Sequence, residues 1–73
     1  MNQKKCVKLK GVIAKHAVME GAETKKAQAE RALIDRACYA RRMDNPGLFT
    51  LDELERLAHA LRIPWSEIAE ALT

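Results

Sequence analysis

The chain has 73 residues, of which 48% are hydrophobic and 32% are charged, a composition typical of one small soluble domain. No stretch approaches the length of apolar sequence that crosses a membrane, and no long apolar run follows the basic N-terminus as it would in a signal peptide. We therefore expect a single cytoplasmic domain over residues 1–73, with its two cysteines, Cys6 and Cys38, as reduced thiols.

Charge is distributed unevenly along the chain, although the net charge is only +3. Residues 1–43, the basic half, contain eleven Lys and Arg against four Asp and Glu, a net charge of +7. Residues 44–73, the acidic half, contain two Arg against six acids, a net charge of −4. Such a domain has a directional field, and its basic half should attract a polyanion such as nucleic acid. The alternative is a solvated surface whose charges are uneven without a function.

The N-terminal segment predicts a short arm, one helix and a loop. Residues 1–5 are polar and are expected to form a disordered arm. The segment from Cys6 to about Val18 is predicted to be helical, with Gly11 inside it as a point where another helix could cross closely. Residues 19–23 contain a glycine and are predicted to form a loop. The inward face of the helix would consist of Leu9, Val12, Ile13 and His16/Ala17.

Residues 24–43 have two possible structures. Thr24 is a good N-cap, and no Gly or Pro follows until Pro46, so a single helix from Lys25 to Met43 agrees with the local signals. However, Asp35 is also a favoured N-cap, and it stands between an apolar pair and a second short apolar run. We therefore favour two short helices separated by a turn near Leu33–Asp35.

The acidic half predicts two further helices. The sequence Asp44-Asn45-Pro46-Gly47 indicates a turn. Thr50 and Glu53 have the spacing of a capping box, after which Leu51, Leu54, Leu57/Ala58 and Leu61 form a helical stripe. Pro64 then opens a last short helix, whose inward residues would be Trp65, Ile68, Ala69 and Leu72. The chain shows no strand pattern, so we predict an all-α fold of about five short helices.

The pattern T-L-D-E-L-x-x-L-A-x-A-L-x-I over residues 50–63, followed by W-S-E-I, resembles the fourth and fifth helices of Cro/CI-type (XRE-like) helix-turn-helix domains of phage repressors. The resemblance covers roughly residues 7–72 and is strongest over residues 45–68. It implies a compact bundle of five helices, in which the second and third form the helix-turn-helix and the third lies in the major groove of DNA.

The same resemblance assigns roles to individual positions. It places Ala29 at the small position of the second helix, Ile34 after the turn and Asp35 at the cap of the recognition helix, about residues 35–43. Lys25 falls where the family often has a glutamine that grips the DNA backbone. The chain departs from the family at Leu33, which replaces the turn glycine, and at Gln28, Ala32 and Arg42, where larger or more apolar residues are usual. The positions that would face base edges or flanking phosphates are Arg36, Ala37, Ala40 and Arg41.

The residue types agree with a DNA-binding surface. The guanidinium groups of Arg36, Arg41 and Arg42 can contact guanine bidentately or clamp a phosphate. Lys25 and Lys26 stand at the start of a predicted helix, where free N–H groups also favour phosphate. For each of these residues, the alternative is a solvated helix face.

No pattern indicates an enzyme, a cofactor or a metal site. The cysteines and histidines lack the paired short spacings of zinc ligands, and no acid–base constellation stands out. We predict a sequence-specific double-stranded-DNA-binding regulator, repressor-like and of the phage type, acting as a homodimer through residues 65–72. The alternative is a small protein-interaction module, such as an antitoxin or phage factor, whose working face is the acidic half.

Overall fold

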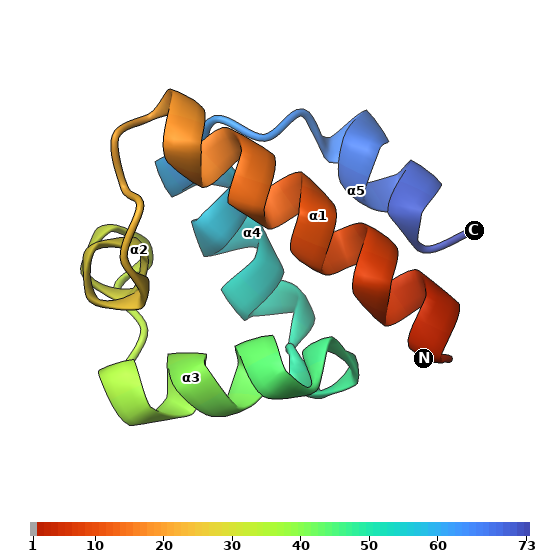
Figure 1. Ribbon diagram of the computed structural model, residues 1–73, viewed down its shortest axis with the longest axis horizontal. Helices are drawn as coiled ribbons and strands as arrows, with labels where there is room; N and C mark the ends of the chain where they lie inside the picture. The colour runs from red at the N-terminus through yellow and green to blue at the C-terminus, as the bar shows by residue number, and fades with distance from the viewer. Residues whose placement is uncertain (1) are drawn as a thin grey trace.

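The computed structural model describes residues 2–73, and it is a bundle of five α-helices with no strand among those residues. The predicted all-α fold is therefore confirmed. Figure 1 shows the longest helix, α1, lying across the bundle, with α2 and α3 toward one side and α5 toward the other. The helices are α1 (Gln3–Met19), α2 (Lys25–Ala32), α3 (Arg36–Asp44), α4 (Leu51–Leu61) and α5 (Trp65–Ala71), with a 3₁₀ turn η1 (Pro46–Leu48) before α4.

Helix α1 begins three residues earlier than the sequence pattern indicated. The side chain of Asn2 accepts a hydrogen bond from the backbone N–H of Lys5 at 2.9 Å, so Asn2 is the N-cap and Gln3 is the first helical residue. The prediction of a disordered arm is therefore wrong for residues 3–5, and Met1 lies outside the described residues. The segment was predicted to be disordered because its residues are polar. One of these polar residues, Asn2, caps α1, so the residues that follow it are helical.

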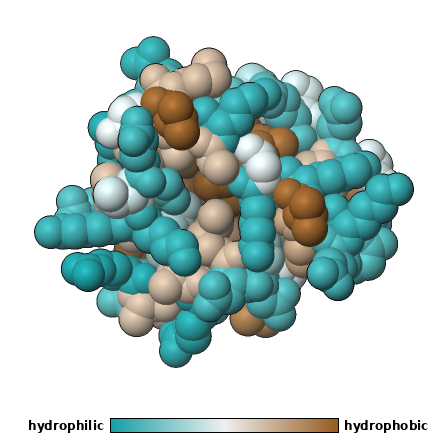
Figure 2. All heavy atoms as spheres, viewed as in Figure 1, coloured by the Kyte–Doolittle hydropathy of each residue, from teal (hydrophilic) through white to brown (hydrophobic). Residues whose placement is uncertain are grey.

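The core lies where α1 packs against α4 and α5, and α4 packs against α2. The face of α1 predicted to point inward does so, with Val12 half-buried at its edge. In the space-filling view, hydrophilic residues cover most of the visible face and hydrophobic ones form small separate patches (Figure 2). The largest fully buried side chains are Tyr39, Leu9, Ile13, Leu57, Leu61, Ile68 and Pro46.

Three residues predicted to point inward are exposed. Leu51 and Trp65 are 63% and 45% exposed, and Ala69 is also exposed. Leu51 shares the angular stripe of the buried Ala58 but lies about two turns nearer the start of α4. Trp65 is likewise the first residue of its helix. Helical spacing gives the direction of a side chain, but no neighbouring element covers these helix ends.

No helix of the bundle crosses α1 closely at Gly11, contrary to the prediction. No atom outside the local helix lies within 4 Å of the position that a Cβ would take on this residue. Glycine inside a helix costs about 1 kcal/mol relative to alanine. The bundle therefore obtains no packing benefit from Gly11 that would offset this cost.

The chain turns sharply between α2 and α3, which excludes the single-helix alternative. Leu33 has φ 57° and ψ 41°, in the left-handed region. The N–H of Ile34 then donates to the carbonyl of Ala29 at 3.0 Å, which closes the end of α2 in a Schellman-type arrangement. Asp35 accepts from the N–H of Cys38 at 3.2 Å and so caps α3, as predicted.

Replacement of Leu33 by glycine is expected to raise the free energy of unfolding by about 0.5–1 kcal/mol. The left-handed conformation strains a side-chain-bearing residue by about 1–2 kcal/mol, and glycine removes this strain while adding some freedom to the unfolded chain. Leu33 is 78% exposed, so little buried surface is lost. Urea denaturation would measure the change. Leu33→Ala is the matched control, because it shortens the side chain but keeps the strain; an equal gain from both variants would contradict the explanation.

Candidate nucleic-acid interface

Helix α3 is attached to the bundle through Tyr39, which is fully buried. Its hydroxyl donates to Oε1 of Gln28 at 2.6 Å, and Nε2 of Gln28 donates to the carbonyl of Ala22 at 2.8 Å. This chain of hydrogen bonds joins α3, α2 and the loop that precedes α2. Burial raises the pKa of the Tyr39 hydroxyl, so this group stays a protonated donor. Tyr39 is therefore a core residue. Gln28 can be buried because its amide oxygen accepts a hydrogen bond from Tyr39 and its amide nitrogen donates one to Ala22.

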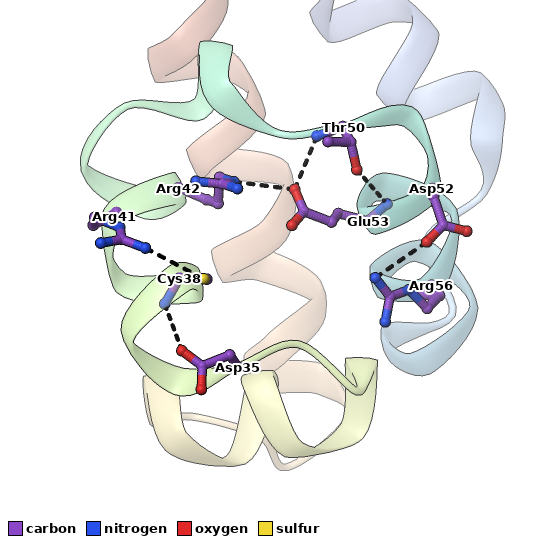
Figure 3. A network of polar contacts seen from close by, with 8 residues as sticks. All are labelled: Asp35, Cys38, Arg41, Arg42, Thr50, Asp52, Glu53 and Arg56. Atoms are coloured by element: carbon purple, nitrogen blue, oxygen red, sulfur yellow. Dashed lines mark hydrogen bonds and ion pairs between the residues drawn. The ribbon is translucent and has the colours of Figure 1, made fainter.

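The C-terminal part of α3 is held by a second network, centred on the carboxylate of Glu53 (Figure 3). Oε1 of Glu53 accepts from the N–H of Thr50 at 2.9 Å and from Nε of Arg42 at 3.1 Å, while Oγ1 of Thr50 accepts from the N–H of Glu53. The backbone N–H of Thr50, followed by the guanidinium of Arg42, holds the pKa of the Glu53 carboxyl below its usual value. The predicted capping box is thus confirmed, and the guanidinium of Arg42 also donates to its carboxylate.

Arg42 consequently has a role inside the protein. Its guanidinium lies against Glu53 and is only 21% exposed, so it does not belong to an outward face of α3. The position of Arg42 therefore does not support the prediction that it contacts DNA.

The turn between α2 and α3 is fixed by a residue that sequence reasoning did not select. Nη1 of Arg56, on α4, donates to the carbonyl of Leu33 at 2.6 Å, and its Nη2 lies 3.1 Å from Oδ2 of Asp52 (Figure 3). The ion pair of Asp52 with Arg56 could be predicted from the sequence, because the two residues are four apart on one helix. The hydrogen bond from Arg56 to the carbonyl of Leu33 could not be predicted, because it joins residues 23 positions apart.

The remaining predicted residues of α3 form one outward face. Arg36, Ala37 and Arg41 are exposed, and Ala40 is half-buried. At 100° per residue these four positions fall within one arc of the helix, whereas the buried Tyr39 falls outside it. Nη2 of Arg41 lies 3.3 Å from Sγ of Cys38, which lays this side chain along the helix (Figure 3).

Lys25 and Lys26 lie on a different helix from these arginines. Both are exposed in the first turn of α2, after the N-cap Thr24, whose hydroxyl accepts the N–H of Ala27. Helix α2 has eight residues, about 12 Å, so the lysines lie at the end far from the turn. In Figure 1, α2 is seen end-on whereas α3 lies across the view, so the two axes cross steeply.

No protein-family model, no curated protein and no solved structure matches this chain significantly. Among residues 2–73, no helix is long and apolar enough to cross a membrane. Within the same residues, no group of three or more His, Cys, Asp or Glu side chains is placed to hold a metal ion.

Proposed function

We propose that this protein binds double-stranded DNA through α3 and reads its sequence, as a small repressor-like transcription regulator. The observation that carries the proposal is the outward face of α3. This face presents Arg36 and Arg41 on a helix that is fixed at its centre by Tyr39 and near its end by Arg42. A helix with this rigidity and this face can lie in the major groove without losing much conformational freedom.

The chemistry of the face supports both base and phosphate contacts. An arginine can donate two hydrogen bonds to O6 and N7 of guanine, and small residues such as Ala37 and Ala40 let the helix approach the base edges. Lys25 and Lys26 add positive charge at the N-terminus of α2, where backbone N–H groups also favour phosphate. Residues 24–44, which form α2 and α3, contain six Lys and Arg against three Asp and Glu, a net charge of +3 that favours the approach of DNA to these two helices.

Alanine substitution of Arg36 or Arg41 is expected to weaken specific DNA binding by about 1–3 kcal/mol if the side chain reads a base, roughly 5- to 150-fold. Arg62→Gly is the matched control: it removes one guanidinium from a side chain that is 83% exposed, at a residue whose φ of 55° suits glycine. Fluorescence anisotropy with a duplex that contains the motif enriched from random DNA would measure the affinities. Unchanged binding by both α3 variants would contradict the assignment of α3.

The first experiment is binding to a pool of random duplexes at two salt concentrations, followed by sequencing of the bound fraction. Salt-sensitive binding with an enriched motif would support a sequence-reading regulator, because phosphate contacts release counterions. An enriched palindrome would indicate a homodimer with half-sites one DNA turn, about 34 Å, apart. Salt-sensitive binding without enrichment would leave a non-specific DNA-binding protein.

A protein-interaction module is the second candidate function. Large apolar side chains are exposed in both halves, and in the acidic half they are Leu48, Leu51 and Trp65. Because residues 44–73 have a net charge of −4, a contact through these three side chains would suit a partner that is both basic and apolar. The absence of DNA binding even at low salt would favour this function over the first.

A further inference from the structure

Helix α1 carries a concentration of positive charge that the proposed DNA contacts do not use. Gln3–Met19 contains five lysines and no Asp or Glu, a net charge of +5, whereas the net charge of the whole chain is only +3. Nζ of Lys15 lies 2.7 Å from Oε1 of Glu67. Over residues 2–73, the other four lysines of α1 form no ion pair within 4.0 Å. Most of the charge on α1 is therefore available to another molecule.

Four exposed residues form an unpaired face on the outer side of α1. They are spaced four, three and four residues apart, so at 3.6 residues per turn they fall within an arc of about 60°. Both valines of the face are 61% exposed. In Figure 1, α1 crosses in front of α4, and no helix of the bundle lies in front of α1. The four residues, which we call the α1 seam, are Val7, Gly11, Ala14 and Val18.

The α1 seam has the spacing of the apolar positions in a coiled coil. In a heptad written a to g, positions a and d form the contact between two helices, and positions e and g flank it. Gly11 and Val18 take a positions, and the other two seam residues take d positions. From residue 8 to residue 15, every e and g position is then a lysine, namely Lys8, Lys10 and Lys15. This face therefore has the pattern of a helix that pairs with another helix.

A cleft of about 520 Å³ beside the α1 seam has room for side chains of a partner. Its lining includes Lys8 and Gly11 from α1 and Glu70 from α5. In paired helices, a large apolar side chain of one helix inserts among four residues of the other. No atom outside the local helix lies within 4 Å of the position of a Cβ on Gly11, so a leucine or isoleucine of a partner helix can occupy this space. The carboxylate of Glu70 keeps acidic groups of the partner on the α1 side of the cleft.

The flanking lysines determine which partner suits the α1 seam. A second copy of α1 would place lysine opposite lysine in either orientation of the two helices, which disfavours self-pairing. A lipid surface is a poor fit, because Gly11 and Ala14 stand where helices that bind lipid surfaces present Trp, Phe or Leu. Phosphates of a nucleic acid would leave the apolar seam without an apolar contact. A helix that carries carboxylates beside an apolar stripe matches both the seam and the lysines.

We propose that the α1 seam binds an amphipathic helix of another protein, with large apolar residues at its a and d positions and Asp or Glu at its e and g positions. Carboxylates of this partner pair with Lys8 on one side of the seam and with Lys10 on the other. The contact is separate from the proposed DNA-binding face, which lies on α3. One molecule can therefore hold DNA and an acidic partner at the same time.

Three fluorescent peptides of three heptads each test the chemistry of the partner by anisotropy. The first has leucine at a and d and glutamate at e and g. The second has lysine in place of glutamate, and the third keeps glutamate but has alanine at a and d. We expect the first peptide to bind the wild-type chain at least about tenfold more tightly than either of the others, because it alone supplies both opposite charge and large apolar residues.

Two results with the peptides would overturn the proposal. Equal affinity for the first and third peptides would mean that the lysines of α1 attract any polyanion and that the seam makes no apolar contact. No binding of the first peptide, or tighter binding of the second, would mean that α1 does not accept an acidic helix. None of these measurements uses DNA, so they test the α1 seam independently of the proposed function.

Charge reversal locates the contact on α1. Lys8→Glu should weaken binding of the first peptide by about fivefold or more, because an attraction beside the seam becomes a repulsion. Lys5→Glu is the matched control: it makes the same charge change on the same helix, about 150° around from the centre of the seam. This control should change the affinity by no more than about twofold. An equal loss from both variants would mean that only the total charge matters, and it would overturn the assignment of the α1 seam.

Gly11→Gln tests the close approach at the centre of the α1 seam. Glutamine forms helix better than glycine, and a Cβ at this position meets nothing within the bundle. The midpoint of thermal unfolding should therefore be at least as high as that of the wild type. Affinity for the first peptide should fall by about tenfold or more, because the added side chain fills the space that the partner needs. Unchanged affinity in this folded variant would overturn the proposal.

Discussion

Replacement of Tyr39 by alanine is expected to lower the free energy of unfolding by about 3–5 kcal/mol. The ring is fully buried and makes an edge-on contact with Phe49, with ring centroids 6.2 Å apart. A core of this size supplies only about 3–5 kcal/mol of net stability, so the variant should be largely unfolded at 25 °C. Far-UV circular dichroism would show the loss of helix, and urea denaturation would measure the remaining stability.

Tyr39→Phe isolates the contribution of the hydroxyl. It keeps the ring but leaves Oε1 of Gln28 buried without a donor, which should cost about 1–3 kcal/mol. Affinity for DNA should fall as well if α3 is the binding helix, because the link from α3 to α2 is lost. A double-mutant cycle with Gln28→Ala should give a coupling energy of about 0.5–3 kcal/mol. Two effects that add without coupling would mean that the hydrogen bond does not stabilise the protein.

The helix starts were largely predictable because capping is a local interaction. Thr24, Asp35 and Thr50 each accept a hydrogen bond from the backbone three residues later, and all three were selected from the sequence. The turn at Leu33 was predicted for the same reason, from the capping residue that follows it. Leu33 was noted as a departure from the turn glycine that the resemblance implies, and the structure places this leucine in the left-handed conformation, with its carbonyl accepting a hydrogen bond from Arg56.

The tertiary contacts could not be predicted in the same way. Arg42 was predicted to contact DNA because a guanidinium can bind guanine or a phosphate, and only its ion pair with Glu53 shows that it lies against the bundle. The resemblance implies an apolar residue at the position of Gln28. Glutamine suits the core there because its amide oxygen accepts a hydrogen bond from the hydroxyl of Tyr39. In both cases the partner is 11 residues away along the chain, and helical periodicity does not specify which side chain it meets. The positions Arg36, Ala37, Ala40 and Arg41 were taken from the family resemblance; the structure places them on one outward arc of α3, and their contact with DNA stays a prediction.

Leu54→Ala should lower the free energy of unfolding by about 2–5 kcal/mol, whereas Leu51→Ala should change it by no more than about 0.5 kcal/mol. Both residues are leucines in the first half of α4, and both were predicted to lie in one apolar stripe. Leu54 is 5% exposed and belongs to the core cluster, while Leu51 is 63% exposed. The pair therefore compares the loss of the same atoms from a buried and an exposed position on the same helix.

Helix propensity does not separate the two variants, because both replace leucine by the stronger helix former alanine. The expected difference between them comes from the cavity and the lost apolar contacts at Leu54 alone. Urea denaturation at a concentration where the chain is monomeric would measure both values without a contribution from self-association. A large loss at Leu51 in this monomer would mean that a neighbouring element covers the start of α4. A loss at Leu51 that appears only at high protein concentration would place this residue in a contact between two copies.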